Sequence, residues 1–211
     1  MASILDLLNS DLGKQLISGA SAQTGQPADK TSSVLSMALP FLLGAMKKNT
    51  ATPDGAAGLL GALGGKHDGS ILDNLGGFFS GGVDEAVQKD GEGILGHILG
   101  NSRPNVENAL SQKSGMDAGS VAQILKVAAP ILMGILGKQT RQSNVNDSSG
   151  LGSLLGGMMG NQTAPQDQSF IESLLDADGD GSIIDDVAGM VLGGNKKKGG
   201  LGGLLGGLFG K

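Results

Sequence analysis

Three aspartates alternate along a short segment near the C-terminal end of the sequence, at Asp176, Asp178 and Asp180. Gly181 and Ser182 follow them directly. Alternate residues of a tightly turning loop point to the same side, so the three carboxylates converge, and carboxylate oxygens are the ligands that hard divalent cations prefer. The glycine permits a sharp turn, after which the serine carbonyl oxygen can add a further ligand. The spacing therefore predicts a cation site.

This segment resembles the first half of an EF-hand loop and the calcium loops of dockerins, with aspartates at positions 1, 3 and 5 and glycine at position 6. It departs from the EF-hand at position 12, where Val187 replaces the bidentate glutamate. A shortened loop must then close with Asp185 or Asp186, and we favour Asp186 because Asp185 has the capping position of its counterpart Asp73. The predicted Ca²⁺ ligands are Asp176, Asp178, Asp180, the carbonyl of Ser182, and Asp186.

Two other interpretations of this acidic loop stay open. One is a different divalent cation in the same place, and the other is an acidic helix start in a solvated linker, without any ion. Clustered carboxylates repel one another when no cation is present. The missing final glutamate lowers the affinity for calcium, which favours a structural site over a sensor.

The charge of the chain is concentrated in one region. The 211 residues have a formal net charge of −5, yet residues 142–195 hold eight acids and no base, and residues 196–211 hold four lysines. This distribution excludes a globally basic nucleic-acid-binding protein, and three adjacent lysines make a weak footprint for nucleic acid. Five Phe, without Trp or Tyr, also leave little aromatic surface for base stacking.

Two segments ninety positions apart share one pattern, which indicates an internal duplication. In each copy we expect a helix that ends at a glycine in a left-handed cap, a short link, and a long apolar helix that is kinked or broken at a proline. Apolar residues nearly encircle the second helix, so we expect it to be buried on most sides. The matching pairs are Gly25/Gly115, Ala28/Ala118, Leu35/Leu125, Ala38/Ala128, Pro40/Pro130, Leu42/Leu132, Gly44/Gly134 and Lys48/Lys138.

No strand-length alternating run stands out, so the predicted fold class is all-α: a multihelical, pseudo-duplicated domain with Gly-rich close-packed helices and a C-terminal helix-loop-helix. The units that we expect are a duplicated helical domain at 1–141 with repeats at about 10–50 and 100–140, a Gly/polar linker with a short Gly-Leu helix at 142–166, an EF-hand-like helix-loop-helix at 167–194, and a Lys-rich link with a Gly-Leu amphipathic tail at 195–211.

The duplicated block, the Gly-Ala-Ala-Gly-Leu-Leu segment at 55–60 and the His-Asp-Gly-Ser-Ile-Leu segment at 67–72 together resemble a bacterial family, the YidB-like proteins or domain of unknown function 937. The resemblance covers about residues 1–160. It implies a multihelical, pseudo-duplicated fold, and it implies no activity.

A Gly-Leu pattern recurs at 150–160 and 200–210, with a looser relative at 58–64. Apolar residues fall on one helical face, and glycines four apart line another face, where we expect a neighbouring helix to approach closely. Since the copy at 150–160 lacks the lysines of the tail, these stripes are more simply helices that dock on their own kind, which allows self-association or binding to another protein. The alternative is a membrane-surface or self-assembling module, in which the tail lies on a membrane.

The segments Asp68–Leu75 and Asp180–Val187 share a helix opener, Asp-Gly-Ser-x-x-Asp. We expect the serine to be the N-cap and the second aspartate to stand at the third helical position, near the positive end of the helix dipole.

Enzyme chemistry finds little support in the sequence. Gly91–Gly96 spells G-x-G-x-x-G, but it follows a helical pattern and not a strand, so we do not expect a nucleotide site. For the two histidines, His67 and His97, we expect capping or packing roles. There is no cysteine to act as a nucleophile. We therefore expect a non-enzymatic protein.

The N-terminus lacks a signal-peptide pattern. The longest charge-free apolar stretch, 31–46, is shorter than the ~20 residues of a spanning helix, so we expect a cytoplasmic protein.

Overall fold

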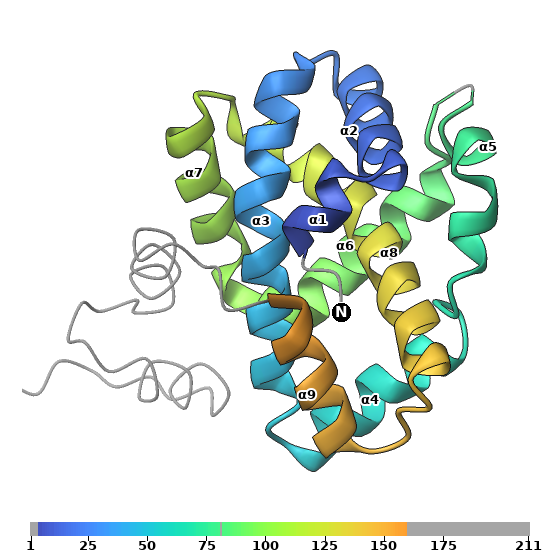
Figure 1. The fold of residues 1–211 in the computed structure, drawn as a ribbon. Helices are drawn as coiled ribbons and strands as arrows, with labels where there is room; N and C mark the ends of the chain where they lie inside the picture. The colour runs from blue at the N-terminus through green and yellow to red at the C-terminus, as the bar shows by residue number, and fades with distance from the viewer. Residues whose placement is uncertain (1–3, 81, 160–211) are drawn as a thin grey trace, which may run out of the picture. The chain divides into compact units, whose positions relative to one another are not determined.

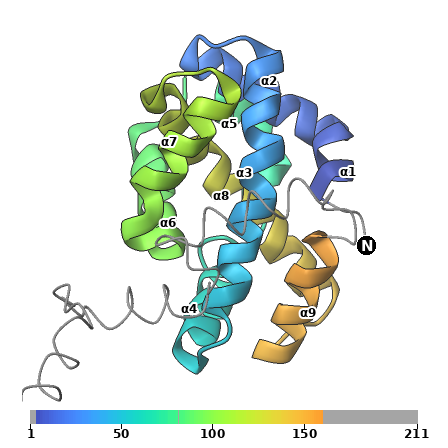
Figure 2. The same ribbon diagram turned by 90° about the vertical axis from the view of Figure 1, so that its left-hand side faces the viewer.

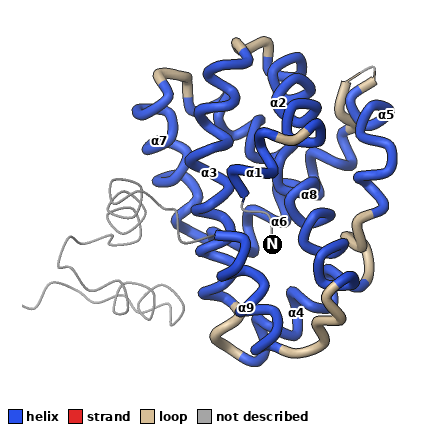
Figure 3. Tube along the Cα trace, in the orientation of Figure 1, coloured by secondary structure: helices blue, strands red, loops and turns tan. Residues whose placement is uncertain are grey.

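The computed structural model describes residues 4–80 and 82–159. The chain divides into two units, 1–174 and 175–211, and every described residue belongs to the first. All elements of this described part are helices (Figure 3), so the all-α prediction is confirmed. They are α1 (Ile4–Asn9), α2 (Asp11–Thr24), α3 (Ala28–Asn49), α4 (Pro53–Gly64), the 3₁₀-helix η1 (Ser70–Asn74), α5 (Leu75–Phe79), α6 (Glu85–Leu99), the 3₁₀-helix η2 (Gly100–Ser102), α7 (Arg103–Ser114), α8 (Ala118–Gln142) and α9 (Ser148–Met159).

Helices α3 and α8 form the centre, and the other helices surround them (Figures 1 and 2). Helix α8 packs against α2, α3, α4, α6, α7, α9 and η1. Every residue from Val127 to Gly137 is buried, which is three full turns of helix with no side facing water. The prediction that the long apolar helices are buried on most sides is therefore confirmed for α8, and α3 has a similar buried run from Ala38 to Leu43.

Neither proline breaks its helix. The sequence predicts a kink or a break at each proline; Pro40 lies inside α3 and Pro130 inside α8, so a break is excluded at both positions. A proline has no N–H, so the carbonyl of the residue four positions earlier loses its helical donor. In α8 this carbonyl belongs to Lys126, and helix α6 lies directly against it at Gly91, where a Cβ atom would overlap the carbonyl oxygen. Close packing of α6 encloses the site of the missing bond.

Ion pairs flank this contact between α6 and α8. The Nζ atom of Lys126 lies 3.2 Å from Glu92 Oε2, and Arg103 Nη1 lies 3.5 Å from Glu92 Oε1. The hydrogen bond from Lys126, followed by the charges of both bases, holds the pKa of Glu92 below its usual value. The motif Gly91–Gly96 thus lies within a continuous helix, as predicted, and its first glycine serves helix packing.

The two links of the proposed duplication have the same local geometry. Helix α2 ends at Gly25 with φ 65°, and α7 ends at Gly115 with φ 64°, so the left-handed glycine caps are confirmed. The hydroxyl of Ser21 donates to the carbonyl of Gln26 at 2.5 Å, and that of Ser111 donates to the carbonyl of Met116 at 2.6 Å. Matching backbone angles are accompanied by matching side-chain hydrogen bonds.

Most glycines of the Gly-Leu helices are not sites of close helix packing. A Cβ atom at Gly58 or Gly61 of α4, or at Gly152 of α9, would meet nothing within 4 Å, and one at Gly156 would meet only the end of the Lys47 side chain, so the expected close approach of helix backbones is wrong at these positions. Leucines make the contact instead, because the apolar stripe of α9 is buried against α3 and α4. Close backbone approaches occur at glycines outside the Gly-Leu segments, at Gly91 and Gly137.

Replacing Gly91 with alanine tests the contact between α6 and α8. We expect Gly91→Ala to lower the free energy of unfolding by about 1–3 kcal/mol, because the added methyl group overlaps the Lys126 carbonyl and backbone must move. Thermal unfolding followed by circular dichroism measures the loss. Gly93→Ala is the matched control in the same helix: its Cβ meets nothing within 4 Å, so it should leave stability unchanged or raise it by up to ~1 kcal/mol. Equal melting temperatures for the two variants would contradict the contact.

Candidate functional site

The predicted calcium loop lies outside the described residues. Asp176, Asp178, Asp180, Ser182 and Asp186 all fall after residue 159, so the loop stays a prediction from the sequence. The predicted Gly-Leu tail and its lysines fall there as well. Within residues 4–80 and 82–159, no group of three or more His, Cys, Asp or Glu side chains is placed to hold a metal ion.

The related opener at Asp68–Asp73 is described, and its geometry differs from the prediction. Gly69, with φ 101°, holds the N-cap position of η1, so the assignment of Ser70 as the cap is wrong. The Ser70 N–H donates to Asp68 Oδ1 at 3.0 Å, while Asp68 Oδ2 lies 3.2 Å from Arg141 Nη1. Hydrogen bonds from Ser70, followed by the Arg141 charge, lower the pKa of Asp68. The first aspartate of the motif is thus the one that binds the helix start.

The role of Asp73 bears on the closing ligand of the acidic loop. Asp73 lies exposed on η1, and Asp68, not Asp73, accepts the hydrogen bond from the Ser70 N–H at the start of η1. Because Asp73 has no capping role, its counterpart Asp185 is not excluded as a calcium ligand. Asp185 and Asp186 therefore have to be compared by substitution.

The end of α8 holds this segment in place at two glycines. At Gly137 a Cβ atom would overlap the carbonyl oxygen of His67, and at Gly134 it would overlap the side chain of Ile71. Across the contact, Gly69 leaves room for the side chain of Lys138. These contacts could not be predicted from the sequence. The partners lie about seventy positions apart, and no charge pattern or repeat spacing pairs them.

His67 is buried, as the expected packing role requires, with 9% of its surface exposed. Its Nε2 atom lies 3.8 Å from Asp90 Oδ2, and Lys66 Nζ lies 2.6 Å from the other oxygen of the same carboxylate. Burial is the largest influence and lowers the pKa of His67, Asp90 raises it, and Lys66 lowers it. By contrast, the His97 side chain is exposed, so a packing role is wrong for this residue.

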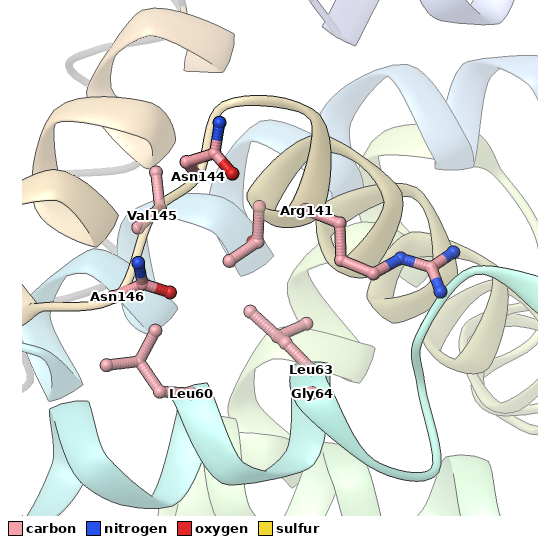
Figure 4. Close-up of a pocket in the computed structure, with 8 residues that line it drawn as sticks. Leu60, Leu63, Gly64, Arg141, Asn144, Val145 and Asn146 are labelled. Carbon is pink, nitrogen blue, oxygen red and sulfur yellow. The ribbon is translucent and has the colours of Figure 1, made fainter.

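A cavity of about 360 Å³ lies between the C-terminal ends of α4 and α8 and the link to α9 (Figure 4). Leu60 and Leu63 point into it from α4, whereas the Arg141 guanidinium extends away (Figure 4). The lining holds no carboxylate, imidazole or thiol, and the hydroxyl of its one threonine, Thr140, donates to the Leu136 carbonyl at 2.7 Å. It is lined by Leu60, Leu63, Gly64, Thr140, Arg141, Asn144, Val145 and Asn146.

One known protein family matches the chain over most of its length. The family model described as "Bacterial protein of unknown function (DUF937)" matches residues 6–139 and 143–211. The chain belongs to this family. No curated protein and no solved structure matches the chain.

Membership of DUF937 agrees with the all-helical fold, and the family description assigns no activity. The match also extends beyond the expected 1–160, because its second part, 143–211, includes the acidic loop and the tail. Among the described residues of this family member, one helix, α8, is long and apolar enough to cross a membrane by length and composition alone, and 72% of its apolar window is buried inside the fold.

The buried histidine makes stability depend on pH. Because the pKa of His67 is lowered below its ordinary 6.5 by folding, the unfolded chain binds more protons as the pH falls through that value, and stability is lost. We expect the melting temperature to fall between about pH 7.5 and about pH 5.5, and His67→Gln to reduce this fall. Carboxylates with lowered pKa, such as Asp68, lose their contribution only below about pH 4.5.

His97→Gln is the control for this pH dependence, since His97 is exposed and the chain has two histidines in all. This variant should keep the fall in melting temperature of the unmodified protein. A fall that His67→Gln leaves intact would show that the buried imidazole is not its cause.

Proposed function

We propose that this DUF937 protein is a non-enzymatic helical protein with a structural calcium site at residues 176–186. The ligands are Asp176, Asp178, Asp180, the Ser182 carbonyl and a closing carboxylate from Asp186 or Asp185. The alternation of three aspartates before Gly181 carries the proposal, because this spacing supplies oxygen ligands in the order that calcium loops use.

The described opener at 64–73 supports the proposal by contrast. An offset of 112 positions aligns Gly64, Lys66 and Asp68 with the three alternating aspartates. The described segment thus has one carboxylate where the acidic loop has three, and Asp68 is balanced by Arg141. Residues 142–195 contain no Lys or Arg that could balance the acidic loop in the same way.

Repulsion makes a divalent cation the natural partner of this loop. Two like charges 4 Å apart cost about 1 kcal/mol even in water, and more where the surroundings are less polar. A bound Ca²⁺ replaces this repulsion with attraction to all three carboxylates. It would fix the angle between a helix ending near Leu175 and another starting near Ser182, which is a structural role.

Calorimetric titration of calcium into the chelator-treated full chain tests the site. We expect a binding isotherm with one site, and loss of the heat in Asp178→Ala, because alanine removes the side-chain oxygen ligand, whereas asparagine would keep one. Asp167→Ala is the matched control, because it removes one carboxylate from the same acidic region outside the loop. Comparing Asp185→Ala with Asp186→Ala identifies the closing ligand, which is the residue whose substitution lowers the affinity more.

Three results would overturn this proposal. The first is an absence of heat together with an unchanged melting temperature in calcium. The second is an Asp178→Ala variant that binds like the unmodified chain. The third is binding of magnesium with the same affinity as calcium. Mg²⁺ demands a stricter octahedral geometry than a calcium loop provides, so equal affinities would contradict a site of this type.

A further inference from the structure

Helix α9 occupies a site made by α3 and α4. It lies alongside the C-terminal half of α3 in both views (Figures 1 and 2). Gly156 faces the end of the Lys47 side chain: a Cβ atom placed on Gly156 would lie 3.3 Å from Lys47 Nζ. Four apolar side chains of α9 hold it there, with 3% or less of their surfaces exposed: Leu151, Leu154, Leu155 and Met158. The helix therefore binds through one stripe, while its glycines contribute little contact.

The C-terminal segment 200–210 repeats the sequence of this helix at an offset of fifty positions. The four buried positions of α9 correspond to Leu201, Leu204, Leu205 and Leu208, so all of them stay apolar. Three of the eleven residues differ, at Ser153, Met158 and Met159 of α9, which become Gly203, Leu208 and Phe209. Ser153 is exposed, and the other two changes keep an apolar side chain. What the site recognises in α9 is therefore present in the tail.

We propose that the surface of α3 and α4 that holds α9 is also the docking site of the tail segment 200–210 of the same chain, so that two helices compete for one site. Residues 160–199 separate the two segments, and even at the 1.5 Å per residue of a helix these forty residues span about 60 Å, so their length does not prevent the exchange. Neither segment contains a residue of the acidic loop, which lies in the link between them.

Two features make α9 the stronger competitor. Asp147 Oδ1 accepts a hydrogen bond from the Gly150 N–H at 2.7 Å, whereas the tail has Lys197 at the corresponding position, next to the positive end of the helix dipole. The link from α8 is also shorter, five residues to α9 against 57 to the tail, which lowers the effective concentration of the tail roughly 40-fold. The tail therefore takes the site when α9 is weakened or removed.

A stability cycle tests this competition. The four proteins are the full chain, Leu155→Asp, a chain ending at Lys198, and the combination of both changes. We expect truncation alone to leave the melting temperature unchanged, because α9 already fills the site. In the Leu155→Asp background the tail replaces the weakened α9, so truncation should lower the melting temperature by at least about 3 °C. Strictly additive effects would overturn the proposal.

Cross-linking gives a second test that does not depend on stability. The chain has no cysteine, so an introduced thiol is unique and can be joined to Lys47 by a short amine–thiol reagent, with the linked peptides identified by mass spectrometry. In the otherwise unmodified chain, Gly156→Cys is the positive control. In the Leu155→Asp background, or in the milder Leu155→Ala if the former does not fold, Gly206→Cys should link to Lys47 within the same chain.

Gly202→Cys is the matched negative control for this link. It corresponds to Gly152, at which a Cβ atom meets nothing within 4 Å, so a helix docked in the same register keeps this thiol away from Lys47. Equal yields from Gly206→Cys and Gly202→Cys would mean that the tail contacts Lys47 without register, which would overturn a specific site. A link that forms only between two copies would equally overturn docking within the chain.

Discussion

Enclosure of helix α8 is the constraint on which the rest of the fold depends. Its run from Val127 to Gly137 is apolar around the whole circumference, so no face can be left to water without exposing leucine, isoleucine or valine side chains. Pro130 adds a second demand, because the Lys126 carbonyl loses its helical donor in the middle of this buried helix. Helix α6 covers that carbonyl, since Gly91 lets its backbone lie directly against it, and α6 is one of the elements that together enclose α8.

The last turns of α8 also organise the polar part of the described domain. Gly134 and Gly137 admit the segment that carries His67 and Asp68, and Arg141, one turn later, binds the Asp68 carboxylate. Lys66 pairs with Asp90 and Asp68 with Arg141, and the lining of the neighbouring cavity includes two leucines and two asparagines. This end of the domain therefore consists of helix caps and ion pairs that fasten α4, η1 and α8 together.

The Gly-Leu helices gain their order from leucine burial. Glycines destabilise a helix by about 1 kcal/mol each relative to alanine, so α9 depends on the site that receives its four apolar side chains. A helix of this kind is ordered when docked and marginal when released, which makes exchange between two nearly identical segments energetically accessible. The same reasoning explains why the exposed glycines Gly58 and Gly61 of α4 are tolerated: they face away from neighbours, and no packing is lost there.

The sequence by itself determined the helical class, the glycine caps at Gly25 and Gly115, and the burial of the two long apolar helices, because periodicity and left-handed caps are local properties. It also indicated that Gly91–Gly96 lies in a helix. Local pattern could not tell which glycines admit a neighbour: Gly44 and Gly134 correspond in the repeat, yet a Cβ atom meets nothing at the first and Ile71 at the second. Nor could it show that Asp68 caps η1 and binds Arg141. Only the tertiary structure decided these points, because each depends on an element brought alongside from a distant part of the chain.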